Sequence, residues 1–275
     1  MTLNNILRKN NITKKFNINT HDFFKPIFNV KLAESRSEIK LAQKLRYNVF
    51  FSERIHSPIL NIGNFRRDSD KFDNYADHII VKFRKSKFSK TKVIGTYRLL
   101  KQSVAEKKSG FYSSDEFNLD NLLNSKIYNN MLELSRSCIS QKFRNKNVLK
   151  LMWNEIYRYI NLNNIDALFG TASFLDTNVN NIEDQIIYLN NNHKMPDNVK
   201  VKALPNYNVK IDYQKKINMN YKLISKLPTL IKAYLKFNAS IGEGAVIDSK
   251  FKTTDVFVFL PIKEINKDYV NKIID

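Results

Sequence analysis

The fold of this chain is decided by the stretch Met131-Leu-Glu-Leu-Ser-Arg-Ser-Cys-Ile-Ser-Gln-Lys-Phe-Arg144, which continues through Asn145-Lys-Asn147 into an apolar pattern that begins at Val148. The stretch predicts a strand, a basic loop and a helix. Glu133 and Arg136 fall inside the strand, where a buried strand ordinarily carries aliphatic residues. The helix start that follows suits an anion, because its first backbone N–H groups have no partner within the helix. A strand, an anion site and buried charge together indicate an enzyme.

The composition allows a sizeable core and points to an anionic partner. The chain has 275 residues, of which 43% are hydrophobic and 12% aromatic, so global disorder is not expected. Its 46 basic residues outnumber its 26 acidic residues, which gives a net charge of +20. This charge predicts a polyanionic partner, whether nucleic acid, an anionic membrane surface or an acidic carrier protein. The alternative is that many lysines only form a solvated face.

The cysteine content and the hydropathy predict a cytoplasmic protein. Cys138 is the single cysteine, which excludes an intrachain disulfide. It lies within the strand pattern, so a buried thiol is favoured over a nucleophile. A reducing compartment is natural for such a chain. No apolar run approaches the ~20 residues of a membrane span, so we expect a soluble cytoplasmic protein or one peripheral to the membrane.

Two segments are expected along the chain. Residues 1–27 should form a flexible arm, and residues 28–275 a single α/β domain with a mixed sheet flanked by helices. Ser35 and Glu38 fit a capping box ahead of the first helix. Period-two and helical patterns predict the remaining elements, with strands at 78–83, 93–100, 167–174 and 255–261 and helices around 182–189 and 227–237.

The strands that begin at Met131 and Ala167 should form the ligand-binding edge of the sheet. They flank a helix of crossover length, so they are expected to be parallel neighbours in a right-handed unit. A ligand is then expected at their carboxyl ends.

This order of elements resembles the GNAT-type N-acetyltransferase fold. In that fold the loop after the fourth strand binds the phosphate of an acyl carrier, with a glycine-containing pattern that begins with Gln or Arg. Here Gln141 keeps the first position, but the loop has no glycine. Cations on Lys142, Arg144 and Lys146 can instead hold the single phosphate of a carrier-protein phosphopantetheine. The donor expected from the resemblance is therefore an acyl carrier protein rather than coenzyme A.

A closer resemblance, to the L-ornithine N(alpha)-acyltransferase family, covers nearly the whole chain from residue 40 onward. It is carried by ordered motifs at 42–51, 71–78, 95–100, 110–113, 132–138, 168–174, 227–234, 244–248 and 253–255. The resemblance implies transfer of a 3-hydroxyacyl chain from acyl carrier protein to the α-amine of L-ornithine, which makes lyso-ornithine lipid. It implies acyl carrier protein as co-substrate and no tightly bound cofactor.

A more distant resemblance is to acyl-homoserine-lactone synthases. Arg46 and Phe50 match the first two positions of their early signature, although His56 stands where that signature has Trp. Further matches are the paired acids, the strand arginine and the Glu-x-x-Arg motif, at Asp70, Asp73, Arg98, Glu133 and Arg136. Both families thus point to the same positions as substrate-binding or catalytic.

Amine attack on a thioester requires a group that accepts a proton. Glu133 is the first candidate for this base and Asp73 the second. The alternative for Glu133 is that it only pairs with Arg136 or Arg98 to neutralise buried charge. Since strand side chains alternate, Glu133 and Arg136 at i and i+3 share one face only if a bulge lies between them.

The remaining polar candidates fit the two ends of an amino acid. Arg46, Arg98 and Arg136 can grip its carboxylate, although at least one should serve structure instead. The acids at Asp70, Asp73 and Asp77 can hold a distal ammonium, or can simply be solvated or capping groups. Trp153, Phe169, Phe174 and the 227–235 stripe are candidate linings of an acyl slot, with core packing as the alternative.

Other chemistries find little support in the sequence. The four histidines are dispersed, so a Cys–His acyl-enzyme route is disfavoured and direct transfer is expected. No metal-ligand spacing and no nucleotide-binding glycine motif occurs, so neither metal nor nucleotide cofactor is expected. The rivals are the same transfer to glycine, glutamine, lysine or a lactone precursor, and a basic nucleic-acid-binding protein. A basic face with the 227–237 helix can also rest on an anionic bilayer.

Overall fold

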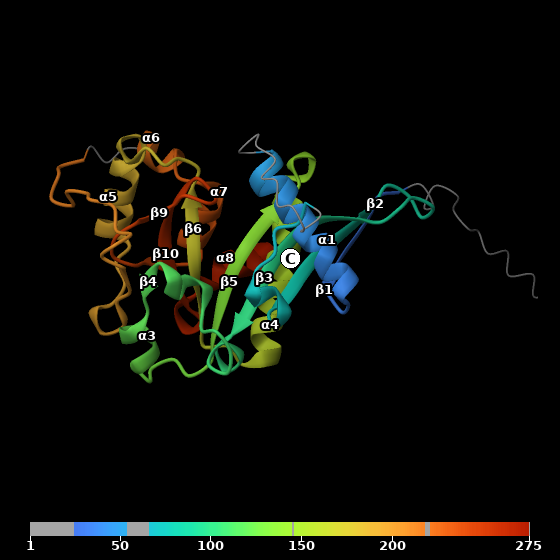
Figure 1. The fold of residues 1–275 in the computed structure, drawn as a ribbon, viewed down its shortest axis with the longest axis horizontal. Helices are drawn as coiled ribbons and strands as arrows, with labels where there is room; N and C mark the ends of the chain where they lie inside the picture. The colour runs from blue at the N-terminus through green and yellow to red at the C-terminus, as the bar shows by residue number, and fades with distance from the viewer. Residues whose placement is uncertain (1–24, 54–65, 145, 218–220, 275) are drawn as a thin grey trace, which may run out of the picture.

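The computed structural model describes residues 25–53, 66–144, 146–217 and 221–274. Their main feature is an eight-stranded mixed sheet in the order β1-β2-β3-β5-β6-β10-β8, with β9 paired to β10 (Figure 1). The strands are β1 Ile27–Leu32, β2 Asp77–Arg84, β3 Lys92–Lys101, β5 Met131–Ile139, β6 Ala167–Phe174, β8 Ser240–Ile241, β9 Val246–Asp248 and β10 Thr253–Pro261. A second, two-stranded sheet pairs β4 Phe117–Asn118 with β7 Lys202–Ala203.

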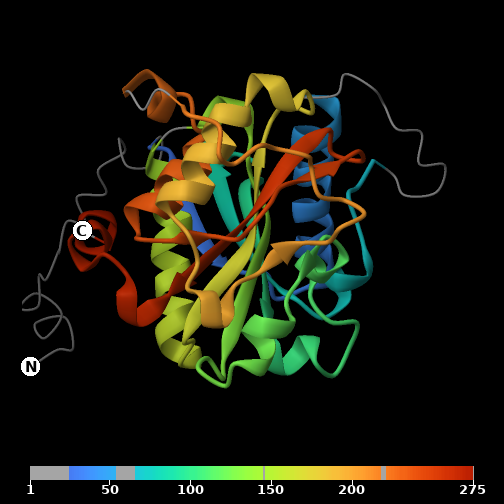
Figure 2. The same ribbon diagram turned by 90° about the vertical axis from the view of Figure 1, so that its left-hand side faces the viewer.

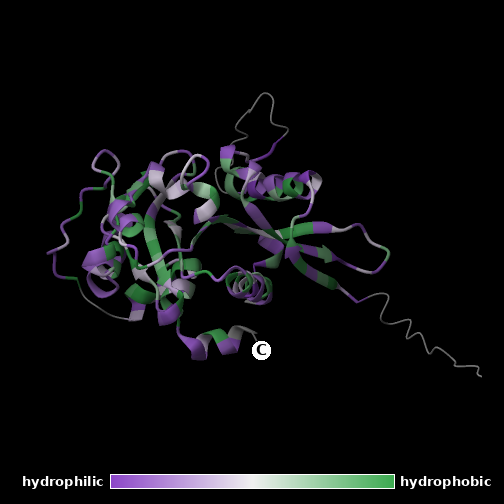
Figure 3. Cartoon of the chain, turned by 90° about the horizontal axis from the view of Figure 1, so that it is seen from below, coloured by the Kyte–Doolittle hydropathy of each residue, from purple (hydrophilic) through white to green (hydrophobic). Residues whose placement is uncertain are grey.

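Helices cover both faces of the large sheet. In Figure 2, α1 and α4 lie on opposite sides of the sheet, with α8 beyond α4. The helices are α1 Arg36–Tyr47, α2 Gln102–Ala105, α3 Asp120–Asn124, α4 Lys146–Asn163, α5 Glu183–Asn192, α6 Tyr221–Ser225, α7 Thr229–Lys236 and α8 Lys267–Ile274. The central strands are largely apolar, whereas the helices carry much of the polar surface (Figure 3). The mixed α/β class expected from the sequence is confirmed.

Alternation along β5 separates two cores. Leu132 and Leu134 pack into the larger core, where α4 supplies Trp153 and Met152. Met131, two residues before Glu133, packs into a second core on the other face, among phenylalanines of β6 and β10. Because side chains i and i+2 of a strand share a face, Glu133 lies on the same face as Met131. The charged residue of β5 therefore faces away from α4.

The parallel pair expected from the sequence is present and separates near its middle. β5 and β6 pair only from Met131–Ala167 to Glu133–Phe169. The close approach just beyond this point requires Gly170, because a Cβ there would lie 2.2 Å from the carbonyl oxygen of Leu134. Toward their carboxyl ends, where a ligand was expected, β5 and β6 are no longer paired with each other.

A β-bulge lies in β5 immediately after the separation. Thr96 of β3 pairs with Cys138, but Arg98, two residues on, pairs with Ser135, so β5 contains one extra residue. Arg136 sits in this bulge with a φ of 55°, in the left-handed region. The condition for Glu133 and Arg136 to share a face is thus fulfilled.

The observed bounds of the predicted helices and strands agree with the predicted bounds to within a few residues. Two details at the start of the chain differ. Ser35 caps α1 by accepting from the Glu38 backbone N–H, but Glu38 accepts from the Glu34 backbone N–H at 2.8 Å and not from Ser35, so the predicted capping box is only half formed. Residue 27 of the predicted arm belongs to β1, and residues 1–24 lie outside the described ranges.

The apolar stripe of α7 does not lie on the surface. Ile231 is fully buried, and it packs in the larger core with Leu227, Tyr234 and Phe237. This stripe therefore packs inside the protein, and contact of a basic face and this helix with a bilayer stays a prediction. Among the described helices, none is both long and apolar enough to cross a membrane.

Candidate active site

Three arginines and three aspartates form one buried group, which we call the arginine–aspartate cluster: Arg46, Arg98, Arg136, Asp68, Asp70 and Asp73. Arg46, from α1, is fully buried and donates through Nη1 and Nη2 to both oxygens of Asp73, at 2.8 and 2.6 Å. Its Nε lies 3.0 Å from Asp68 Oδ2. The charge of Arg46 is therefore compensated from within the cluster, although its buried Nε meets Asp68 as an ion pair without a hydrogen bond.

The other two arginines approach the cluster from neighbouring strands. Arg98 of β3 donates to Asp70 at 2.5 Å and through Nε to Ser135 Oγ at 3.0 Å, whereas its Nη2 is buried without a hydrogen-bond partner. Arg136 lies 3.2 Å from Asp68 and from Asp70. Asp70 and Asp73 also cap the 3-10 turn Lys71–Asn74 reciprocally. The structure thus brings together the predicted Arg46, Asp70, Asp73, Arg98 and Arg136.

Two aspartates of the cluster, Asp70 and Asp73, are held ionised. Burial by itself would raise the pKa of Asp73, but hydrogen bonds and charge from Arg46 outweigh it and hold that pKa well below its ordinary value. Asp70 behaves likewise, because the charge of Arg98 outweighs burial and lowers its pKa. His78 lies 3.7 Å from Asp73, and burial lowers its pKa to about 4, so it is neutral. Asp73 is consequently a weak proton acceptor.

Asp77, the third acid predicted to bind an ammonium, does not join this group. It accepts a hydrogen bond from Tyr159 of α4 and so faces the other side of the sheet. The reason is the period of β2: His78, the next residue, faces Asp73. The predicted set of Asp70, Asp73 and Asp77 is therefore wrong as a single group.

Glu133 is fully buried and hydrogen-bonded outside the arginine–aspartate cluster. Its Oε1 accepts from the Ser113 N–H at 2.7 Å and the Ser113 hydroxyl at 2.6 Å, and its Oε2 accepts from the Tyr112 N–H at 2.9 Å. Within the described ranges it forms no ion pair with Arg98 or Arg136, so the alternative of simple charge pairing finds no support. Burial outweighs these hydrogen bonds and raises the pKa of Glu133, so this carboxylate binds a proton more readily than Asp73 does.

Aromatic rings enclose the Arg136 guanidinium. Its central carbon lies 4.4 Å from the ring centroid of Tyr112 and 4.5 Å from that of Phe251. The predicted Phe50 is half-buried and packs edge-on against Phe251, with centroids 5.4 Å apart. Phe50 therefore supports the wall beside Arg136.

In the basic loop after β5, some side chains bond to the protein and others face solvent. Arg144 donates to the Ile139 carbonyl at 3.0 Å and pairs with Glu53, which turns it back toward the protein. Gln141 and Lys142 are exposed in the 3-10 turn Gln141–Phe143. The backbone of Lys146 begins α4, and its side chain lies outside the described part of the chain. The loop thus offers Gln141 and Lys142 to solvent.

The remaining sequence candidates are packing residues. Cys138 is buried against Leu45 of α1 and Val49 of the π-helical turn Asn48–Ser52, and burial raises the pKa of its thiol, which opposes a nucleophilic role. Trp153 packs on Phe237 in the larger core, with ring centroids 4.4 Å apart. Phe169 stacks on Phe257 in the second core. These contacts favour the alternative of core packing.

Three further acids lie together that sequence reasoning missed. One carboxylate oxygen from each of Glu116, Asp248 and Asp255 lies within 4.8 Å of the other two. We call this group the acidic trio. The only local sequence signal was that Asp248 and Asp255 belong to the family-like tail motifs; nothing in the pattern connects them to Glu116.

Several known proteins resemble this chain. A profile of the acetyltransferase (GNAT) domain matches residues 45–154, from α1 into α4. The L-ornithine N(alpha)-acyltransferase of Brucella abortus is 37% identical over 88% of this chain and 87% of its own length. That of Rhizobium meliloti is 36% identical over 88% and 82%, respectively. Among solved structures, the CoA-dependent acyl-homoserine lactone synthase BjaI has a TM-score of 0.48 at 12% identity, over 90% of each chain.

Proposed function

The chain belongs to the L-ornithine N(alpha)-acyltransferase family, and we propose that it transfers a 3-hydroxyacyl group from acyl carrier protein to the α-amine of L-ornithine, giving lyso-ornithine lipid. The family and the GNAT domain make it an acyltransferase. The observation that carries the proposal is the arrangement at the β5–β6 separation, where Arg136, Glu133 and Tyr112 meet. It combines a carboxylate-binding cation and a proton acceptor at the ligand-binding edge.

The acceptor carboxylate is assigned to Arg98 and Arg136. Arg46 already forms ion pairs with Asp68 and Asp73, so its role is to hold the cluster together. Arg98 retains one unpartnered Nη2 donor, and the side chain of Arg136 is 7% exposed. A carboxylate that binds there replaces missing hydrogen bonds at guanidinium groups already held in place.

Glu133 is assigned as the proton acceptor in preference to Asp73. The amine must lose a proton so that its nitrogen can form the new bond to the thioester carbon. The carbon–sulfur bond then breaks, and the thiolate of the pantetheine takes up a proton as it leaves. Glu133 has the raised pKa that suits this role, whereas Asp73 is held ionised by Arg46. Its bonds to Tyr112 and Ser113 also position the segment beside Arg136.

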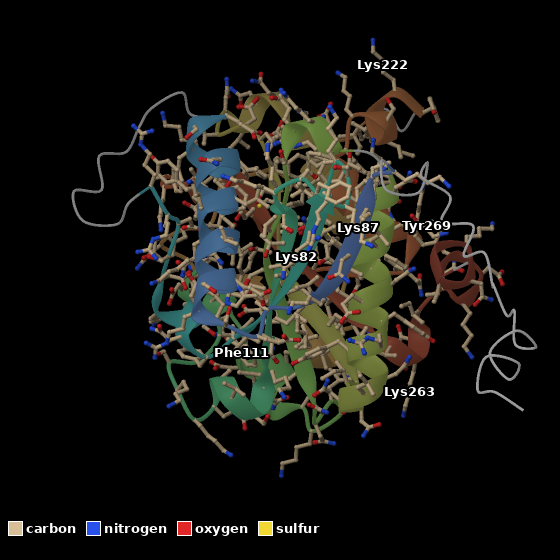
Figure 4. The ribbon with its side chains drawn as sticks, turned by 90° about the vertical axis from the view of Figure 1, so that its right-hand side faces the viewer. Lys82, Lys87, Phe111, Lys222, Lys263 and Tyr269 are labelled. Carbon is tan, nitrogen blue, oxygen red and sulfur yellow. The ribbon has the colours of Figure 1, made fainter. Side chains whose placement is uncertain are left out.

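The donor is assigned to acyl carrier protein on charge and on the loop. The net charge of +20 favours association with an acidic protein. Figure 4 labels Lys82, Lys87, Lys222 and Lys263 on four separate segments, and of these Lys82 is paired with Glu38. Gln141 and Lys142 are the exposed contacts for the phosphate, and Lys146 follows them at the start of α4.

Purified protein with two matched donors tests the proposal. A 3-hydroxyacyl thioester on acyl carrier protein and the same thioester on coenzyme A are each offered with L-ornithine, glycine, L-glutamine and L-lysine, and mass spectrometry identifies the product. The expected result is Nα-acylated ornithine, formed faster from the carrier protein. Preferred acylation of another acceptor would contradict the assigned acceptor, and equal rates from coenzyme A would contradict the assigned donor.

A further inference from the structure

The acidic trio lies on the same face of the sheet as Glu133. In β10 the side chains of Asp255, Phe257 and Phe259 share a face, and the two phenylalanines pack in the second core with Met131. Glu116 comes directly before Phe117, whose ring lies 5.6 Å from that of Phe257. Asp248 ends β9, which pairs with β10. Three segments far apart in sequence therefore converge at one point of this face.

The trio has unsatisfied acceptor atoms. Asp255 is 5% exposed, and its Oδ1 has no hydrogen-bond partner; Glu116 Oε2 is likewise sealed from solvent without one. Asp248 uses Oδ1 to accept from the N–H groups of Lys250 and Phe251, at 2.8 and 3.0 Å. Within the described residues, none of the three acids forms an ion pair. Buried carboxylates so close together require a cation between them or must hold protons.

The pKa values of the trio also favour the binding of a cation. Burial, strengthened by the other two acids, raises the pKa of Glu116 to about 8. Burial also raises the pKa of Asp255 to about 6, although the neighbouring Ser173 and Thr253 oppose this rise. A cation that enters the trio would lower both values and would be held by the resulting charge.

The trio adjoins the arginine–aspartate cluster. Phe251, which donates its N–H to Asp248, is one of the two rings that enclose Arg136, and Tyr112, the other, lies within the field of Glu116 and Asp248. Tyr112 and Phe251 thus connect Arg136 to the trio, and the charge of Arg136 reaches both Glu116 and Asp255. A free diamino acid carries a carboxylate at one end and an ammonium at the other, with the α-amine beside the carboxylate.

We propose that the acidic trio binds the side-chain ammonium of the diamino acid acceptor. This inference rests on the proposed function and names the group that selects the acceptor. An ammonium has three N–H donors and the trio presents three carboxylates, which gives each donor one acceptor. Asp248 and Glu116, which are only partly buried, form the entrance, and Asp255 forms the floor. Bound in this way, the side-chain amine is protonated and cannot attack the thioester, so the acyl group goes to the α-amine.

Acceptor discrimination tests this proposal. L-Norvaline has the carbon chain of L-ornithine without the distal amine, so the ratio of the two kcat/KM values measures recognition of the ammonium. Asp255→Asn should raise the KM for L-ornithine by about 10- to 100-fold, the value of a lost charge-assisted hydrogen bond, and leave kcat/KM for L-norvaline nearly unchanged. Glu116→Gln should raise the KM for L-ornithine in the same way but to a smaller extent. This variant provides the test if Asp255→Asn does not fold.

Matched controls separate this result from its alternatives. Asp268→Asn removes an exposed acid on α8, which packs on α4 at the opposite face, and should leave the ratio unchanged. An unchanged ratio in both Asp255→Asn and Glu116→Gln would overturn the inference while leaving transfer to ornithine intact. A wild-type protein that acylates no ornithine would instead overturn the proposed function. Activity lost to EDTA and restored by Mg²⁺ or Ca²⁺ would show that the trio binds a metal ion, which also contradicts the inference.

Discussion

The arginine–aspartate cluster and the acidic trio are both buried charged groups on the same face of one sheet, yet they are opposite in their state of pairing. In the cluster three arginines meet three aspartates, and each of the six residues has an ion-pair partner of the other type. In the trio three acids meet within 4.8 Å, and two of their oxygens have no partner. The difference indicates that the cluster compensates its own charge and leaves one donor, Arg98 Nη2, for a carboxylate, whereas no cationic side chain of the described residues is paired with the trio.

Breaking the core of the cluster should give the largest effect. Arg46→Met leaves Asp68 and Asp73 buried without their main partner, which should cost about 3–5 kcal/mol of the free energy of unfolding. Chemical denaturation monitored by circular dichroism measures this. Arg144→Met is the matched control, because that arginine is half exposed and its pair with Glu53 should contribute less than about 1 kcal/mol. Equal losses from both variants would show that the cluster is not a stabilising unit.

Removing the proposed base should affect chemistry more than stability. Glu133→Gln keeps an oxygen that can accept from Ser113 but cannot take up a proton, so kcat should fall by about 100-fold or more. Single-turnover kinetics with acyl carrier thioester measures the step. Asp73→Asn is the comparison: it removes a group that Arg46 holds ionised, and we expect it to lower stability before it lowers the rate per folded molecule. Retained turnover in Glu133→Gln would remove that residue from the mechanism.

The element that connects the two regions can be tested through Arg136. Arg136→Lys keeps the charge but loses the planar group held between Tyr112 and Phe251. We expect KM for the acceptor to rise by about tenfold, because a lysine cannot bind a carboxylate with two parallel hydrogen bonds. Steady-state assays at saturating donor give this value. A rise confined to the KM of the donor would place Arg136 on the other side of the site.

The pH dependence of stability distinguishes the trio from the cluster. The pKa of Glu116 is raised from 4.5 to about 8, so its protonated form stabilises the fold at low pH, and this contribution is lost as the pH rises between these values. The groups that shift its pKa are Asp255, Asp248, Asp115 and Arg136. Glu116→Gln should flatten the decline of Tm over this window, measured by thermal denaturation without acceptor. A decline as steep as that of the wild type would mean that Glu116 is ionised throughout.

The smallest effect is expected at the carrier-binding loop. Lys142→Glu reverses an exposed charge, which should raise the KM for acyl carrier protein a few-fold at low salt and less at high salt. Kinetics at two ionic strengths measures the difference. Lys107→Glu, an exposed lysine just after α2, is the control, and an equal effect there would show that the carrier responds only to net charge.

The sequence predicted the cluster better than the trio for a physical reason. Glu133 and Arg136 lie in one strand, and their spacing of three made a bulge a requirement that the register of β3 and β5 fulfils. Asp70 and Asp73 lie in one turn and were found together. The trio joins Glu116 to Asp248 and Asp255 only through the pairing of β9 with β10 and the packing of Phe117 on Phe257, and no local period encodes those contacts.

One error shows the limit of a local pattern. Asp77 was grouped with Asp70 and Asp73 because it follows them closely, but the alternation of β2 directs it to Tyr159. The apolar stripe of the 227–237 helix likewise did not identify its partner, which is the core around Ile231. A pattern gives the face of an element, and only tertiary packing decides what that face meets.

Calorimetry of acceptor binding tests most directly whether the acidic trio, unlike the arginine–aspartate cluster, gains its cation from the acceptor. With Asp255 near a pKa of about 6 and Glu116 near about 8, the free trio holds protons at neutral pH that an incoming ammonium displaces. Titration of L-ornithine and L-norvaline into the protein, in buffers of different ionisation enthalpy, counts those protons. Since Glu116 holds most of these protons at neutral pH, the account predicts more protons released with L-ornithine than with L-norvaline, and no such difference in Glu116→Gln. Equal proton counts for the two ligands in the wild-type protein would contradict it.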